Sequence, residues 1–206
     1  MADSDSTPTR RHLLRGAAWA APAAAVAVAA PSVAASSAPL LGGSLTVSSS
    51  TGPAGTTNRR QTITINGSAE YPTAGIWMEN VPVSPNPTAA RYTLYLPSPT
   101  HAGLTWTRVG TDSTWTIPTA DSGAPAISGY TAYTTTYSNP ATVTSWGRDN
   151  NLRRIYATGR PHFQAVRSVG SNATVPALTV YSLRRVSYNG RPYTLQRGPS
   201  TLAPTP

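Results

Sequence analysis

Short alternations of hydrophobic and polar residues run along the chain and determine its predicted secondary structure. In QTITIN, residues 61–66, the isoleucines fall on one face and the threonines on the other. The same period of two recurs in SLTVS at residues 44–48 and in RYTLYLP at residues 91–97. This period is typical of a β-strand with one buried face. Because no long amphipathic helix pattern follows residue 36, the sequence predicts a β protein.

The clearest predicted hairpin lies at residues 178–198. Asn189-Gly190 suits a type I′ turn, because both turn positions need positive φ. Pro192 lacks a backbone donor, so we expect its strand at a sheet edge. Before the turn the hydrophobic alternation changes phase at Arg184-Arg185. We expect a β-bulge there that returns the flanking hydrophobic residues to one face.

Prolines indicate where strands are not expected. Residues 71–91 contain four prolines, which predicts a surface loop. Residues 104–118 predict two strands joined by a turn at residues 110–113, with Trp115 and Ile117 on one face of the second strand. The Pro-rich residues 199–206 predict a disordered tail.

Length and composition favour one domain. The chain has 206 residues, of which 39% are hydrophobic and 11% charged, and it has no cysteine. Many short strands with frequent turn signals predict an all-β fold, an antiparallel β-sandwich over residues 36–198. A domain of about 150 residues buries roughly 68–70% of its unfolded surface, so it does not need disulfides.

The N-terminal run TRRHLLR, residues 9–15, resembles the twin-arginine export signal. Arg10 and Arg11 match the arginine pair, and Leu13 and Leu14 match the hydrophobic positions, although phenylalanine is more usual at the first of these. Lysine is likewise more usual at position 15, where this chain has arginine.

The residues after this run support a removable signal instead of a membrane anchor. They are mostly alanine and are interrupted by prolines, whereas a spanning helix needs about 20 strongly apolar residues. Small residues then predict cleavage by signal peptidase after Ala34 or Ala35. The resemblance implies that residues 1–35 form a signal peptide helix and that the twin-arginine translocase and signal peptidase act as partners during export. It also implies a secreted protein, loosely held at the cell wall or released, similar to small exported proteins of high-GC Gram-positive bacteria.

A second resemblance concerns residues 90–140. The spacing of Trp106 and Trp115, followed by a strand rich in Tyr and Thr, is similar to the immunoglobulin-like repeats of bacterial surface adhesins. It implies an immunoglobulin-like form of the sandwich.

Side chains suited to catalysis are scarce after residue 36. The carboxylates there are Glu70, Glu79, Asp112, Asp121 and Asp149. Their spacing does not favour the facing pair that a glycosidase needs. His101 and His162 are too few and too far apart for a metal site, and no Gly-x-Ser-x-Gly elbow occurs. We therefore expect no catalytic residues, no metal and no cofactor.

Positive charge and aromatic residues are the remaining candidates for recognition. After residue 36, thirteen arginines against five carboxylates leave a net charge of +8. Outside the cell such charge attracts anionic wall polymers, and no nucleic acid partner is expected; alternatively it only keeps the surface solvated. The four tryptophans after residue 36 are expected in the core. The predicted ligand surface consists of Arg153, Arg154, Arg184, Arg185, Tyr133 and Tyr137.

These observations predict a secreted, non-enzymatic β-sandwich that acts as a cell-wall or extracellular interaction module. One alternative is a carbohydrate-binding module, in which exposed Trp and Tyr stack on sugars. A further alternative is a secreted hydrolase whose site is not visible in the sequence.

The export signal can be tested directly. We expect replacement of both Arg10 and Arg11 by lysine to block secretion, because the resemblance assigns recognition to the arginine pair. The measurement is the amount of protein in the culture medium compared with the cells. Undiminished secretion of the double variant would contradict the assignment.

Overall fold

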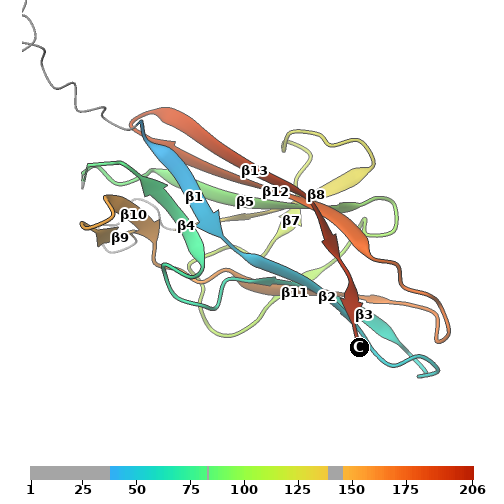
Figure 1. Cartoon of the computed structure of the whole chain (residues 1–206). Coiled ribbons are helices and arrows are strands. Elements are labelled where there is room, and N and C mark those ends of the chain that lie inside the picture. Colours follow the sequence, from blue (N-terminus) through green and yellow to red (C-terminus); the bar gives the residue numbers. More distant parts are fainter. Residues whose placement is uncertain (1–37, 83, 139–145) are drawn as a thin grey trace, which may run out of the picture. The chain divides into compact units, whose positions relative to one another are not determined.

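The computed structural model describes residues 38–82, 84–138 and 146–206, which form an all-β unit of three sheets (Figure 1). The part of the chain that it describes contains no helix, and hence none long and apolar enough to cross a membrane. Outside this part lie the predicted export signal and cleavage positions: Arg10, Arg11, Leu13, Leu14, Ala34 and Ala35.

Sheet A has four antiparallel strands. Their order is β1 (Leu40–Ser44), β4 (Gly75–Glu79), β10 (Arg154–Ala157) and β9 (Trp146–Asp149).

Sheet B has five strands, and only its first pair is parallel. Their order is β14 (Pro204–Thr205), β2 (Thr46–Thr51), β3 (Arg60–Asn66), β11 (His162–Ser168) and β6 (Trp106–Arg108).

Sheet C has five antiparallel strands. Their order is β13 (Arg191–Leu202), β12 (Leu178–Tyr188), β5 (Ala89–Pro97), β8 (Tyr130–Thr136) and β7 (Thr119–Ala120).

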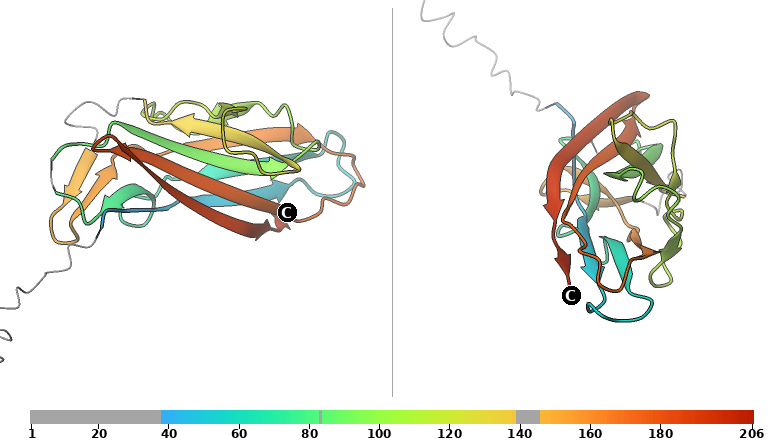
Figure 2. Two further views of the ribbon diagram at one scale, coloured as in Figure 1. Left: turned by 90° about the horizontal axis from the view of Figure 1, so that it is seen from above. Right: turned by 90° about the vertical axis from the view of Figure 1, so that its right-hand side faces the viewer.

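Sheets A and B form one layer of the structure, and this layer faces sheet C (Figures 1 and 2). β1 continues into β2 through Leu45, and β10 continues into β11 through residues 158–161. At the edge where β1 and β2 lie, β13 leaves sheet C and is followed by β14, which pairs with β2 in sheet B. The structure is therefore a β-sandwich in which the edge strand β13 of one layer is followed by β14 in the other layer.

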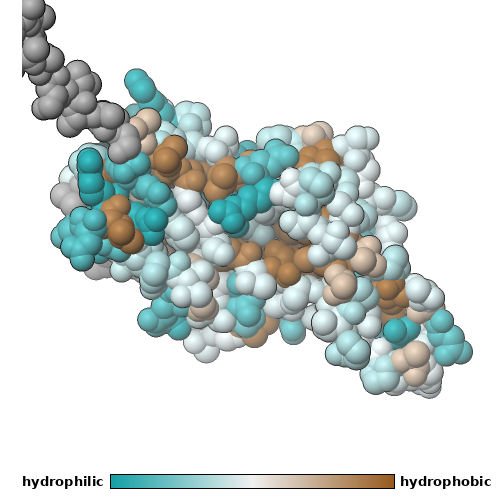
Figure 3. All heavy atoms as spheres, in the orientation of Figure 1, coloured by the Kyte–Doolittle hydropathy of each residue, from teal (hydrophilic) through white to brown (hydrophobic). Residues whose placement is uncertain are grey.

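One edge of the sandwich is a seam between the layers. There β1 and β2 lie against the edge strand β13. Apolar atoms line the surface along this seam (Figure 3).

The inner strand faces form one hydrophobic core. Sheet B contributes Ile63 and Ile65, as the alternation predicted, and sheet A contributes Ile76 and Met78. The predicted strand in residues 91–97 supplies three more buried side chains: Tyr92, Leu94 and Leu96. Each fully buried side chain of this size favours folding by about 1.5–3 kcal/mol.

The hairpin at residues 178–198 is confirmed. Asn189 and Gly190 have φ values of 50° and 69°, which a type I′ turn requires, and they connect β12 to β13. β13, which contains Pro192, is the edge strand of sheet C.

The bulge expected at Arg184-Arg185 is wrong. Strand β12 keeps a regular register with β5, and the irregularity lies between Val180 and Ser182, where the β13 side has the extra residue. The alternation therefore continues unbroken and turns Arg184 toward the core, where only 2% of the residue is exposed.

Two segments predicted to be irregular form strands. Residues 75–79, inside the expected loop of residues 71–91, form β4, because the prolines lie on either side of these five residues. The expected disordered tail, residues 199–206, instead completes β13 and adds β14, which pairs with β2. Pairing with β2 gives the backbone of this segment hydrogen-bond partners, which its proline content did not predict.

Trp115 and Ile117 do not share a face. Trp115 is fully buried and bridges Tyr137, whereas Ile117 is 44% exposed. The segment after β6 leaves sheet B at this point and approaches sheet C, so no regular strand alternation applies.

His101 predicts a pH dependence of stability. It is 1% exposed, and burial lowers the pKa of His101 below its ordinary value of 6.5. The unfolded chain therefore takes up this proton at higher pH than the folded chain does, so the stabilisation is present above about pH 6.5 and is lost as the pH falls.

We expect the free energy of unfolding to fall between about pH 7.5 and about pH 5.5, and to fall less in His101→Gln. Urea denaturation at the two pH values measures it. His162→Gln, which retains His101, is the matched control, and an equal loss in His101→Gln and wild type would contradict the prediction.

Candidate functional site

The outward face of sheet A carries an aromatic row between two glycines. Gly42, Trp77, Tyr156 and Gly147 lie opposite one another across the four strands. The inward neighbours of Trp77, Ile76 and Met78, are buried in the core, so strand alternation directs the indole outward.

The glycines allow both rings to lie against the sheet. A Cβ atom on Gly42 would lie 2.2 Å from Trp77 Nε1, and one on Gly147 would lie 2.1 Å from Tyr156 Cζ. Real Cβ atoms do not approach other atoms so closely. The indole therefore covers β1, and the phenol ring covers β9.

Tyr71 adds a third ring from the turn before β4. Its ring stacks on Tyr156 with centroids 3.9 Å apart and planes 4° apart. It meets Trp77 edge-on, with centroids 5.8 Å apart and planes at 83°. We call these three half-buried rings, Tyr71, Trp77 and Tyr156, the aromatic platform.

Beside the platform lies a row of charged residues. Glu79, Arg154 and Asp149 lie opposite one another on neighbouring strands, and we call them the charged row. Glu79 Oε1 accepts a hydrogen bond from Trp77 Nε1 at 2.7 Å and lies 2.8 Å from Arg154 Nη2. Tyr71 Oη donates to Asp149 Oδ2 at 2.9 Å, and Arg154 Cζ lies 5.3 Å from the centre of the Trp77 ring. Each charged side chain therefore contacts a platform ring.

These contacts shift the pKa values of Asp149, Tyr71 and Arg154. The Leu152 backbone N–H and the Tyr71 hydroxyl lower the pKa of Asp149. Burial, and then the neighbouring Asp149, raises the pKa of Tyr71, which Arg154 opposes. The Tyr71 hydroxyl and Glu79 raise the pKa of Arg154. Near neutral pH the row therefore presents an ionised Arg154 and an ionised Asp149 beside a neutral phenol.

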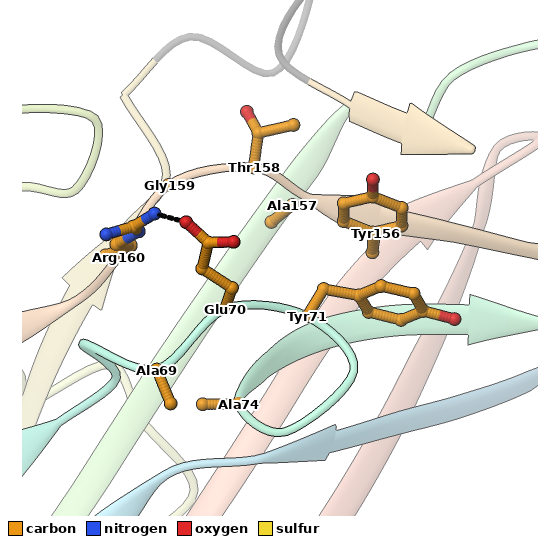
Figure 4. Close-up of a pocket in the computed structure, with 9 residues that line it drawn as sticks. All are labelled: Ala69, Glu70, Tyr71, Ala74, Tyr156, Ala157, Thr158, Gly159 and Arg160. Atoms are coloured by element: carbon orange, nitrogen blue, oxygen red, sulfur yellow. Dashed lines mark hydrogen bonds and ion pairs between the residues drawn. The ribbon is translucent and has the colours of Figure 1, made fainter. Parts of the chain in front are cut away.

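A pocket of about 240 Å³ opens next to the platform (Figure 4). Tyr71 and Tyr156 form one side of it, and the ion pair of Glu70 with Arg160 lies on the other. The backbone around Gly159 closes the pocket between them. The site thus combines aromatic surfaces, hydrogen-bonding groups and a small concavity.

The structure does not bring the six predicted ligand residues together. Arg154 belongs to the charged row, and Arg153 lies exposed next to it at the turn between β9 and β10. Arg185 lies on the outward face of sheet C, 3.6 Å from Asp121.

The other three predicted ligand residues lie inside. Tyr133 and Tyr137 share a face, as expected, but that face is the core, and they are 1% and 2% exposed. Arg184 is also buried, so these three side chains do not form a ligand surface. The predicted exposed position was wrong for these three residues, because alternation identifies residues on one face without showing which face is covered.

Sequence reasoning missed the platform itself. Trp77 was assigned to the core and lies on a surface, whereas Trp106, Trp115 and Trp146 are buried as expected. The available signal was the sequence GIWME, in which Trp77 alternates with the apolar residues Ile76 and Met78.

Comparison with protein-family models, curated proteins and solved structures finds no match to this chain. Within residues 38–82, 84–138 and 146–206, no group of three or more His, Asp or Glu side chains is placed to hold a metal ion. The geometry described above therefore carries the functional argument.

The flanking glycines give a test of the platform geometry. Gly42→Ala should displace the indole from β1 and break its hydrogen bond to Glu79, because the added methyl group occupies the position of the ring. We expect an altered near-ultraviolet circular dichroism signal from Trp77 and a loss of stability of about 0.5–1.5 kcal/mol.

Gly52→Ala is the matched control, since its Cβ would meet nothing closer than Arg59 Cγ at 3.9 Å. In a Trp77→Phe background, Gly42→Ala should leave the tryptophan signal unchanged. A spectral change that persists there would show that the ring affected is not Trp77.

Proposed function

We propose that this protein is a non-enzymatic carbohydrate-binding module that uses the outward face of sheet A. The observation that carries the proposal is the aromatic platform, whose indole and phenol rings pack over Gly42 and Gly147 with the charged row beside them.

The platform suits the apolar faces of sugar rings. A pyranose presents C–H groups on its faces and hydroxyl groups around its edge, and aromatic rings offer large, rigid apolar surfaces of similar size. Gly42 and Gly147 fix the rings before any ligand arrives, which lowers the entropic cost of binding.

The charged row suits the hydroxyl groups. Carboxylates accept hydrogen bonds and a guanidinium donates them, and charge-assisted hydrogen bonds are roughly twice as strong as neutral ones. The adjoining pocket has room for a group as large as one sugar unit, which its polar wall of Glu70 and Arg160 can hydrogen-bond.

Charge balance favours a neutral polysaccharide over an anionic wall polymer. Arg154 is paired with Glu79, Arg160 is paired with Glu70, and the charge of Asp149 offsets that of the exposed Arg153 beside the row. A polyanion would have to displace these carboxylates, so the net charge of the whole chain does not act at this face.

The carboxylates of the charged row support a role in binding without catalysis. A glycosidase needs one carboxylic acid whose pKa is raised, so that it can protonate the leaving group. The pKa of Asp149 is lowered, and Glu79 is already engaged by Trp77 and Arg154. These groups suit hydrogen bonding to a ligand.

The proposal places this module outside the cell, after export by the twin-arginine route predicted from residues 1–35. Neutral polysaccharides of cell walls and of the surroundings are then the accessible ligands. An immunoglobulin-like relationship of the sandwich to adhesin repeats stays a prediction that accords with a surface-binding role.

Retention on insoluble polysaccharides tests the proposal. We expect the protein to be retained on at least one of cellulose, chitin or purified peptidoglycan, and Trp77→Ala to weaken retention roughly tenfold, because one stacked ring contributes about 1.4 kcal/mol. Binding isotherms at low and high salt measure this, and retention should depend little on salt.

Tyr130→Ala is the matched control, since it removes a half-buried ring from sheet C. Binding that disappears in high salt but survives Trp77→Ala would indicate electrostatic binding to a wall polymer instead. Unchanged retention with only a lowered melting temperature would show that the platform is structural.

A further inference from the structure

A second pocket, of about 240 Å³, lies in the seam between the two layers. Leu45 and Val47 line it from the bend between β1 and β2. The other lining residues come from sheet C: Tyr92, Leu94, Val180, Tyr181, Ser182, Arg184, Arg197, Ser200 and Leu202. The bulge between β12 and β13 lies at this same place, and bulges are over-represented next to functional sites.

Arg184 projects into this seam from β12. It is 2% exposed, yet neither its Nε nor its Nη1 has a hydrogen-bond partner among the described residues. The Tyr92 ring lies 5.5 Å from its Cζ atom and offers a cation–π contact. Gly43 covers the side chain, and a Cβ atom there would lie 3.1 Å from Arg184 Nε. Arg184 is thus held rigidly with donor groups unused.

No carboxylate of the described residues compensates this charge. Each of the five is engaged elsewhere: Glu70 with Arg160, Glu79 with Arg154, Asp112 with Thr114, Asp121 with Arg185 and Asp149 with Tyr71. Arg197, the other charged group that lines the pocket, is also positive. The pocket is therefore electropositive.

Burial makes this arrangement costly for the protein alone. An unpaired buried cation is among the most destabilising features a fold can contain. Burial lowers the pKa of Arg184, and Arg197 lowers it further while Tyr92 opposes the shift, but a guanidinium stays protonated in proteins. An anion that entered the pocket would supply the missing charge and accept the free N–H groups.

The apolar lining residues of the pocket indicate the chemistry of the rest of the ligand. Leu45, Val47, Leu94, Val180 and Leu202 are apolar, and they surround the arginine on both layers. The volume corresponds to about eight water molecules at roughly 30 Å³ each, which suits a short hydrocarbon chain and excludes a large lipid.

We infer that the seam pocket binds a small amphipathic carboxylate, with its carboxylate on Arg184 and its hydrocarbon chain against the leucine and valine side chains. Fork-shaped hydrogen bonding from a guanidinium matches a carboxylate. Ser182 and Ser200 lie on the same wall and can hydrogen-bond the second oxygen. This site is separate from the proposed polysaccharide face and does not depend on it.

Octanoate is the probe for this site. At ten times its dissociation constant we expect octanoate to raise the melting temperature of the wild-type protein by roughly 3–6 °C. Octan-1-ol, which has the same chain without the charge, should raise it much less, and acetate, which has the charge without the chain, should also be weak. Equal stabilisation by octan-1-ol and octanoate, or none by octanoate, would overturn the inference.

Variants then locate the site. Arg184→Met should abolish the octanoate-dependent shift without lowering the melting temperature of the free protein, because an apolar side chain of similar length replaces an uncompensated charge. Arg185→Met is the matched control, since that neighbour faces outward toward Asp121 and should retain the full shift. An octanoate shift retained in Arg184→Met would overturn the assignment to this pocket, whatever the outcome of the polysaccharide experiment.

Discussion

Burial of one face of each strand is the constraint on which the rest of this structure depends, because a chain without cysteine has no disulfide to join its layers. The inner residues of sheets A and B meet those of sheet C in a single core. Once one face is committed to that core, the alternate residues of the same strands face outward. Trp77 is on the surface because Ile76 and Met78 are not.

Two connections between sheets, β1 to β2 and β13 to β14, give the sandwich its particular features. β1 and β2 are nearly continuous, so the same segment supplies Gly42 to the aromatic platform and Leu45 to the seam pocket. β13 and β14 connect the two layers, which brings the C-terminal residues of the chain beside β2. The seam between the layers lies where β1 and β2 meet β13, and at this seam one inward-facing side chain is the arginine Arg184.

The sequence predicts the strands better than it predicts their faces. Alternation identified the strands with Ile63 and Leu94, and the Asn189-Gly190 turn identified the longest hairpin, because these signals are local. Strand β4 was missed because prolines on both sides suggested a loop, although the five residues between them contain none. The tail was missed because its partner β2 lies about 150 residues earlier in the chain, and long-range pairing leaves no local pattern.

Arg184 is the clearest example of a residue whose strand was predicted from the sequence but whose face was not. The hydrophobic residues on either side of it predicted a change of phase at Arg184-Arg185, yet an unbroken alternation with β5 places Arg184 inside. After residue 36, five carboxylates cannot pair thirteen arginines, so the positions of the carboxylates decide which arginines are neutralised. On sheet A, Glu79 and Asp149 accompany Arg154, and the face is suited to ligands that need hydrogen bonds without net charge. In the seam no carboxylate accompanies Arg184 among the described residues, and the complementary group has to come from a ligand.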